Sequence, residues 1–284
     1  MKINSIRAYI EILKKIDVDK GYSIFFRGHS KEKDYKLIPS IYRQDKTGFL
    51  ENEDIIYREI QSYLPDEFIN ERTSFDSLVK MQHYLIPTRL LDITKNPLVA
   101  LYFAAKKNFG VRGEVIVFKV PVANIRHYDS DSVTVIANLV KRPSSFDISQ
   151  YDEDTESFNK QDEIQYLLHE IRSEKPHFSP IIQKDTLNSV QCVNPKMNNQ
   201  RILRQEGAFF LFGIDGMKKY PANIESNWLL FNNSDKLFIH QKKKILEELN
   251  LFGINERFLF PELENQYKYL NDKYNTFENK LKTT

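Results

Sequence analysis

Residues 82–94, QHYLIPTRLLDIT, alternate polar side chains that could do chemistry with large aliphatic ones. A guanidinium here could hold a phosphate, a carboxylate could stabilise positive charge, and an imidazole could move a proton. An apolar segment, 98–105, follows directly, so some polar groups must turn inward, where an unpaired group costs about 1–3 kcal/mol. Either Arg89 and Asp92 pair and brace a turn, or several of the groups line a pocket. The groups are Gln82, His83, Thr88, Arg89, Asp92 and Thr94.

A second candidate is Arg27, which follows the aromatic and aliphatic run at 22–26. That run predicts a strand, so we expect Arg27 at the end of a sheet, where clefts open. Its planar guanidinium suits phosphate or carboxylate groups, and Gly28 beside it allows a sharp turn or the close approach of a ligand. The alternative is a structural arginine that pairs with a nearby carboxylate or with the carbonyl end of a helix.

A third polar cluster is the pair Gln205 and Glu206, which stands just ahead of Gly207 and a predicted strand at 208–212. Because side chains alternate along a strand, only one of the two can face a pocket. Ordinary solvation of a sheet edge is the alternative interpretation. If the functional interpretation holds, three clusters far apart in the chain converge on one cavity.

Helices and strands must position these groups. Asn96 is expected to cap a helix whose first residue is Pro97 and whose residues 98–105 are apolar on all sides, as in a buried helix that ends at Gly110. Three adjacent lysines, Lys242, Lys243 and Lys244, are expected to form a solvated helix face. Further helices are predicted at 4–17, 51–63, 75–83 with Ser74 as cap, 160–173, 241–251 and from Pro261, and strands at 22–26, 114–120, 208–212 and 236–240.

The irregular alternation of strands and helices favours an α+β fold, a mixed or antiparallel sheet flanked by helices, over a doubly wound one. We expect one domain over 1–284, with a polar excursion around 129–160 and a helical tail at 261–284.

The composition excludes several classes of protein and site. The formal charge is only +2, so no basic excess indicates a nucleic-acid-binding protein. The single cysteine, Cys192, excludes an intramolecular disulfide and a cysteine-based zinc cluster, and no metal site is predicted. No signal-like or membrane-spanning apolar run is visible, so we expect a cytoplasmic protein without membrane contact.

Several of these runs, spread over nearly the whole chain, together resemble one known family, the FRG domain, which is widespread in bacteria and their mobile elements, so the resemblance implies a single FRG domain over 1–284. Ile86 stands where that family usually has Gly, and Ile93 where it often has Trp. Because the family is chiefly of unknown function, the resemblance implies no activity by itself. The matching runs are Phe26-Arg27-Gly28, Leu37-Ile38-Pro39-Ser40, Gln82-His83 with Pro87-Thr88-Arg89-Leu90-Leu91-Asp92, Arg201 with Gln205-x-Gly207-x-Phe209, and Phe260-Pro261-Glu262-Leu263.

The order of the three clusters is also similar to that in ADP-ribosyltransferases, with Ala100–Ala104 as an A-x-x-F-A helix. That similarity implies that Arg27 grips NAD phosphates or ribose, that Thr94 or Thr88 orders the pocket, and that Glu206 stabilises an oxocarbenium-like centre. The chain lacks a Ser-Thr-Ser triplet and a Glu-x-Glu pair. If Gln205 faces inward, Asp92, alone or with His83, becomes the acidic group.

The leading hypothesis is therefore a nucleotide pocket, with NAD as substrate and no permanently bound cofactor, that supports ADP-ribosyl transfer or NAD hydrolysis in a toxin or antiphage system. A protein or nucleic acid is the expected acceptor in transfer. The alternatives are a non-catalytic nucleotide sensor and a nucleic-acid-binding module that uses Arg27, Arg89, Arg201 and Arg204. The predicted catalytic residues are Arg27, Thr94, Glu206, Asp92 and His83, and the predicted nucleotide-binding residues are Arg27, Gly28, Gln82, Thr88, Arg89 and Gln205.

Overall fold

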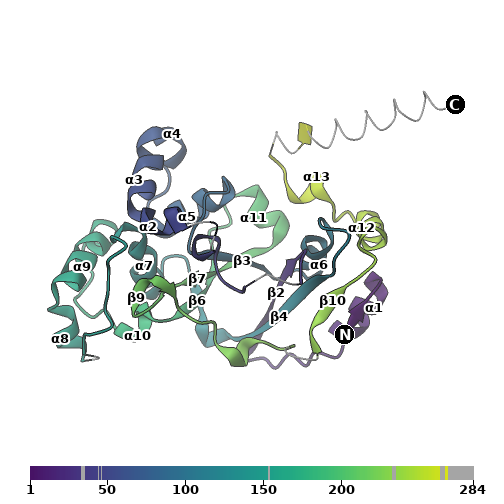
Figure 1. The fold of residues 1–284 in the computed structure, drawn as a ribbon, viewed down its shortest axis with the longest axis horizontal. Helices are drawn as coiled ribbons and strands as arrows, with labels where there is room; N and C mark the ends of the chain where they lie inside the picture. The colour runs from purple at the N-terminus through teal and green to yellow at the C-terminus, as the bar shows by residue number, and fades with distance from the viewer. Residues whose placement is uncertain are drawn as a thin grey trace.

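The computed structural model describes residues 1–267 except 33–35, 44, 46, 153, 232–234 and 263–265. Its strands are β1 (Lys2–Ile3), β2 (Tyr22–His29), β3 (Leu90–Thr94), β4 (Gly113–Pro121), β5 (Ile125–His127), β6 (Val190–Asn194), β7 (Gly207–Phe212), β8 (Ile214–Asp215), β9 (Met217–Pro221) and β10 (Leu237–Ile239). Within the described residues, eight of them form one mixed sheet in the order β1-β10-β4-β2-β3-β7-β6-β5 (Figure 1). Helices flank this sheet, which confirms the predicted α+β class.

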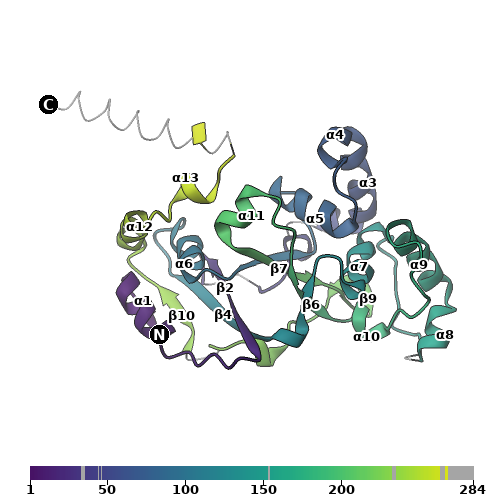
Figure 2. The ribbon, with the colours of Figure 1, turned by 180° about the vertical axis from the view of Figure 1, so that it is seen from behind.

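Two groups of helices lie at opposite ends of the sheet, and Figures 1 and 2 show them from opposite sides. At the end near β10 lie α1 (Ile6–Leu13), α6 (Pro97–Ala105) and α12 (Lys242–Leu251), and at the other lie α7 (Asp131–Ala137), α8 (Thr155–Asn159), α9 (Asp162–Glu174) and α10 (Lys184–Leu187). The remaining helices are α2 (Thr47–Glu51), α3 (Glu53–Tyr63), α4 (Pro65–Phe68), α5 (Ser74–His83), α11 (Gln200–Gln205), α13 (Glu256–Leu259) and the 3-10 turns η1 (Ser40–Tyr42), η3 (Val122–Asn124), η4 (Asn138–Lys141) and η5 (Ser226–Trp228). No described helix is long and apolar enough to cross a bilayer.

The buried helix α6 begins as its sequence predicts. Asn96 Oδ1 accepts from the backbone N–H groups of Leu98 at 2.9 Å and Val99 at 3.3 Å, and Pro97 occupies the first turn. Its end differs from the prediction, because α6 stops at Ala105, and Asn108 rather than Gly110 has a positive φ, of 55°. An asparagine tolerates this left-handed conformation better than most residues do, so glycine was not required.

The polar elbow predicted between the α5 and α6 regions is wrong, because its second half is a central strand. β3 pairs antiparallel with β7 along its whole length, from Leu90 opposite Leu211 to Thr94 opposite Gly207. Four of its five residues are buried, and Asp92 alone is exposed. The elbow was predicted because polar residues interrupt the aliphatic ones, but β3 is covered on both faces, and such a strand need not alternate strictly.

The structure differs from the sequence predictions at two further positions, the cap of α5 and the first lysine of α12. Thr73 rather than Ser74 caps α5, with its Oγ1 accepting from Asp76 N at 3.1 Å. Lys242 is not part of a solvated face: it is 4% exposed, and its Nζ donates to the carbonyl oxygens of Ser30, Lys107 and Asn108 at 2.6–2.9 Å. Three bonds to carbonyl oxygens replace the water that a lysine normally keeps.

The region around 129–160 contributes to the core. It contains α7 and η4, and the side chains of Val133, Phe146 and Phe158 are fully buried. Sparse aromatic residues therefore anchor a segment whose composition is polar and acidic. The C-terminal helix predicted from Pro261 falls largely outside the described residues.

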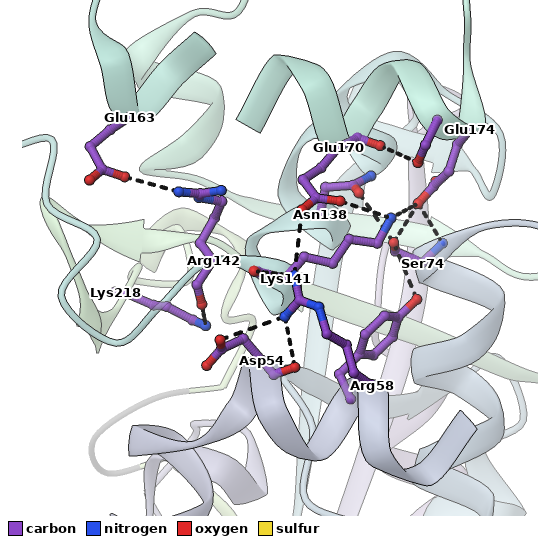
Figure 3. A network of polar contacts seen from close by, with 12 residues as sticks. Asp54, Arg58, Ser74, Asn138, Lys141, Arg142, Glu163, Glu170, Glu174 and Lys218 are labelled. Atoms are coloured by element: carbon purple, nitrogen blue, oxygen red, sulfur yellow. Dashed lines mark hydrogen bonds and ion pairs between the residues drawn. The ribbon is translucent and has the colours of Figure 1, made fainter. Parts of the chain in front are cut away.

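A polar network joins the helices at the α9 end of the molecule (Figure 3). Lys141 Nζ donates to Glu174 Oε1 at 2.9 Å, and the same oxygen accepts from Ser74 N at 3.0 Å. Arg58 of α3 donates to the carbonyl oxygen of Lys141 at 3.1 Å. Because the Glu174 side chain is only 6% exposed, these contacts stabilise a buried carboxylate and fix α3, α5, η4 and α9 to one another.

Candidate functional site

A polar cavity of about 200 Å³ opens where β2 and β3 meet the ends of α5 and α11. Arg27 comes from β2, Asp92 from β3, Gln82 from α5 and Arg201 from α11. The turn η1 and the residue after it supply Ser40 and Arg43, and aliphatic residues complete the wall: Leu85, Ile86, Leu90 and Leu91. We call this the Arg27 cavity.

The pairing of the strands explains why the cavity opens at Arg27. β2 pairs with β4 along eight residues, from Tyr22 to His29, but it pairs with β3 only through Phe26 and Thr94. Arg27 lies just past this single pair, inside β2 rather than after its end as predicted. Its Nη1 donates to the backbone carbonyl oxygen of Asp92, so a side chain takes the place of the next backbone bond between the two strands.

A chain of hydrogen bonds orients the acidic group of the cavity. Gln82 Nε2 donates to Asp92 Oδ2 at 3.0 Å, and Gln82 Oε1 accepts from Thr88 Oγ1 at 2.7 Å. Arg27 Nη1 lies 3.9 Å from the same Asp92 oxygen; the Arg27 side chain is 10% exposed and that of Asp92 is 57% exposed. The carboxylate is therefore fixed by its neighbours yet open to a ligand.

The charge of the Arg27 cavity is positive. Three guanidinium groups, of Arg27, Arg43 and Arg201, line it together with one carboxylate, that of Asp92, and a second carboxylate lies close by, since Arg201 Nη1 is 3.8 Å from Glu262 Oε1. Arginines gathered in a concave site raise the local concentration of anions and bind phosphate or carboxylate through paired N–H groups. Among the described residues, no group of three or more His, Cys, Asp and Glu side chains is arranged to hold a metal ion.

Arg89 lies in the core and away from the cavity. The alternative in which Arg89 pairs with Asp92 is wrong: Arg89 Nε donates to Glu53 Oε1 at 3.0 Å, and its side chain is 0% exposed. Lys218 Nζ lies 3.0 Å from Glu53 Oε2, and Arg89 Nη1 donates to Phe212 O at 3.2 Å. A nucleotide cannot reach Arg89, and neither can a nucleic acid on the surface.

Thr94, Gln205 and Glu206 lie together, but they form a structural junction between β3 and α11. Thr94 Oγ1 donates to Gln205 O at 2.5 Å and accepts from Asn96 N at 2.9 Å. Gln205 Nε2 donates to Leu259 O at 3.0 Å, and Glu206 Oε1 accepts from Asn96 Nδ2 at 2.9 Å. Glu206 is exposed in the left-handed region with φ of 45°, so it ends α11 and precedes the strand. The predicted convergence of three clusters therefore fails for Gln205 and Glu206, which do not line the Arg27 cavity, although Arg201 of the same helix does.

Replacing Thr94 with valine should lower the free energy of unfolding by about 1–3 kcal/mol, because Gln205 O and Asn96 N would lose a buried partner. Thr94→Ser keeps the hydroxyl and should lose less than half as much. Urea denaturation of the three proteins measures both values. A Thr94→Val protein as stable as the original would contradict the structural role.

Gly28 has no room for a ligand on the side where a Cβ would stand. That position lies 1.7 Å from the carbonyl oxygen of Ala100 and 2.8 Å from Ala104 N, so the backbone of α6 already fills it. The glycine allows close packing of strand and helix. The role predicted for Gly28 in binding would therefore have to be indirect.

His83 lines a neighbouring cavity of about 150 Å³, not the Arg27 cavity. Burial, and next the charge of Arg201, lower the pKa of His83 to about 4, so its imidazole is neutral at physiological pH. Its Nδ1 lies 3.1 Å from Nδ2 of Asn199, the residue that caps α11. Asn199 and Arg43 were not predicted as site residues. Asn199 could have been found as an asparagine at the start of a helix, whereas no sequence pattern marks Arg43.

Comparisons with known proteins agree with part of the sequence analysis. The family model described as FRG domain matches residues 22–111, which include Arg27, Gln82, His83 and Asp92. Neither a search of curated proteins nor one of solved structures finds a match, and no comparison supports a similarity to ADP-ribosyltransferases. Two central strands and the helices between them lie in the matched segment, together with most of the Arg27 cavity. Residues 22–111 of this chain are an FRG domain.

Proposed function

We propose that the Arg27 cavity binds the phosphate groups of a nucleotide, with NAD as the ligand. The observation that carries this proposal is the meeting of three arginines from separate segments, Arg27, Arg43 and Arg201, around one exposed carboxylate. Buried or half-buried guanidinium groups suit phosphate oxygens because their N–H groups are planar and permanently charged. The aliphatic wall formed by residues such as Leu85 and Ile86 offers a surface for the less polar parts of the ligand.

Asp92 is the acidic group in this proposal. Of the two carboxylates suggested by the sequence, it lines the Arg27 cavity, whereas Glu206 bonds to Asn96. In NAD hydrolysis, the bond between the ribose C1′ and the nicotinamide nitrogen breaks, water adds to C1′, and neutral nicotinamide and a proton are released. A fixed carboxylate stabilises the positive charge that develops on the ribose, as oriented groups do in other electrostatically assisted reactions. Loss of NAD by this reaction would suit a toxin or antiphage effector.

Two arginines on the same short helix provide a matched test of binding. Arg201 lines the Arg27 cavity, whereas Arg204 Nη1 donates to Phe258 O at 3.2 Å. Titration calorimetry with ADP-ribose and NAD should show a loss of affinity of about ten- to hundredfold in Arg27→Ala and Arg201→Ala, because each removes a charged contact. Arg204→Ala should bind like the original chain. Equal affinities in all four proteins, or no binding by any, would exclude this cavity as a phosphate site.

Asp92→Asn separates catalysis from binding. The amide keeps the shape of the side chain and can still meet Gln82, but it cannot stabilise positive charge. We expect ADP-ribose binding within about threefold of the original and a loss of NAD cleavage of at least about a hundredfold, followed as nicotinamide release. Binding of NAD without nicotinamide release by the unchanged chain would indicate the alternative function, a nucleotide sensor that signals to a partner.

A further inference from the structure

The Arg27 cavity has a neighbour on the same two helices, which we call the His83 cavity. Gln82 of α5 lines the first and His83, the next residue, lines the second; likewise Arg201 of α11 lines the first and Ile202 the second. The cavity volumes are about 200 and 150 Å³, each below the range of about 300–1,000 Å³ typical of ligand sites, so a ligand of nucleotide size would have to occupy both.

The two cavities differ in charge. Two carboxylates and two ammonium groups line the His83 cavity, those of Glu71, Asp76, Lys80 and Lys196. Their formal charges cancel, and each ammonium group has a carboxylate partner: Lys196 Nζ lies 2.6 Å from Asp76 Oδ2, and Lys80 Nζ lies 3.0 Å from Glu67 Oε2 and 4.0 Å from Glu71 Oε1. The His83 cavity is therefore neutral overall beside a positive one. An uncharged polar group suits it better than a second phosphate does.

The hydrogen bonds of Asn199 determine which imidazole nitrogen carries the proton. Asn199 Oδ1 accepts from the backbone N–H groups of Arg201 at 2.7 Å and Ile202 at 3.4 Å, so its Nδ2 is the donor. His83 Nδ1, 3.1 Å from that Nδ2, must then accept. In a neutral imidazole the other nitrogen, Nε2, carries the hydrogen and can donate it.

The remaining lining combines apolar side chains with a further hydrogen-bonding group. Phe75, Val79 and Ile202 provide the apolar surface, and Asn198 adds an amide. A flat ring with ring nitrogens would pack on these apolar side chains and accept a hydrogen bond from His83 Nε2–H or from the side-chain amide of Asn198. Nucleobases have this combination, and neutral ones avoid the cost of placing a charge in a partly buried site.

We propose that the His83 cavity binds the nucleobase of the nucleotide whose phosphates the Arg27 cavity holds, with His83 Nε2–H as a donor to the ring. This inference rests on the proposed function of the Arg27 cavity. His83 is then a residue that determines specificity, and it takes no part in breaking bonds. The cationic nicotinamide ring of NAD would lie outside this neutral cavity, which assigns the adenine end of NAD to it.

Pyrophosphate and ADP are the two probes that test this, because pyrophosphate reports on the Arg27 cavity alone. Calorimetry on the full chain should show ADP binding at least about tenfold more tightly than pyrophosphate. His83→Ala should weaken ADP binding by about three- to tenfold, the effect of one neutral hydrogen bond, and leave pyrophosphate binding unchanged. His83→Gln keeps a neutral N–H donor and should recover part of the loss. Thermal melting checks that each variant is folded.

The outcomes separate the two proposals. Pyrophosphate binding with ADP no tighter, or with ADP affinity unaffected in both His83 variants, would overturn the assignment of the His83 cavity and leave the phosphate site intact. Equal weakening of both probes by His83→Ala would also overturn it, because the histidine would then act on the phosphates. No binding of either probe would remove the proposed function and this inference together.

Discussion

Replacing Gly28 with alanine is expected to prevent the chain from folding. The new Cβ would lie 1.7 Å from Ala100 O, 2.7 Å from Ala100 C and 2.8 Å from Ala104 N. These are backbone atoms of a helix, so no rotation of a side chain relieves the clash, and β2 and α6 must separate. Overpacking typically costs about 1–3 kcal/mol where side chains can adjust, and here the loss should exceed that range. Soluble yield and urea denaturation measure it.

Gly21 provides the matched control for this experiment. It lies just before β2, and a Cβ placed there meets nothing within 4 Å. Gly21→Ala should change the free energy of unfolding by no more than about 0.5 kcal/mol. If Gly28→Ala proved as stable as Gly21→Ala, the close contact between β2 and α6 would be incorrect, and the glycine would need another explanation, such as ligand approach.

Glu53→Gln should lower the free energy of unfolding by about 3–5 kcal/mol, because it leaves the charges of Arg89 and Lys218 buried without a counter-ion. The three side chains are between 0% and 3% exposed. Glu59, exposed on the same helix, is the matched control, and Glu59→Gln should have little effect. Chemical denaturation of both variants tests this. Adding Arg89→Met to Glu53→Gln should restore part of the stability, since one uncompensated charge is then removed.

The same cluster predicts how stability responds to acid. Burial alone would raise the pKa of Glu53, but the charges of Arg89 and Lys218 outweigh it and hold the pKa below its ordinary value. A carboxylate with a lowered folded-state pKa contributes stability above its unfolded pKa of about 4.3, and this stability is lost as pH falls through the folded pKa. Glu53→Gln should therefore flatten the loss of stability below about pH 4.3. An unchanged acid slope would assign the effect to other groups.

Local signals in the sequence predicted the elements that local chemistry determines. Asn96 and Pro97 marked the start of α6, and the strand at 114–120 is confirmed as β4. Pairing between distant residues was not predictable in this way. Glu53 had the features of an ordinary acid in the first turn of a helix, and nothing in the sequence indicates that Arg89, 36 residues later, is its partner. Burial decides such pairs, and burial depends on the whole fold.

The residues of the candidate site also divide into those that local sequence signals predicted and those whose place depends on distant contacts. Arg27, Gln82 and Asp92 were predicted from their residue types, and the structure places them around one cavity. The prediction for Glu206 assumed alternation along a strand, but the residue has a left-handed backbone before the strand begins, so alternation does not apply. Arg43 was not predictable, because it follows a short 3-10 turn whose place depends on distant contacts.

The neighbours of β2 and β3 limit how the matched segment can be used by itself. β2 takes most of its backbone bonds from β4, at Gly113–Pro121, and β3 takes its own from β7, at Gly207–Phe212. Both partners lie beyond residues 22–111. A fragment cut at those limits would carry two apolar strands with open edges, a state prone to aggregation. Any other protein that contains this segment must supply strands equivalent to β4 and β7. The limits of the matched segment, 22–111, are therefore not the limits of a unit that folds by itself.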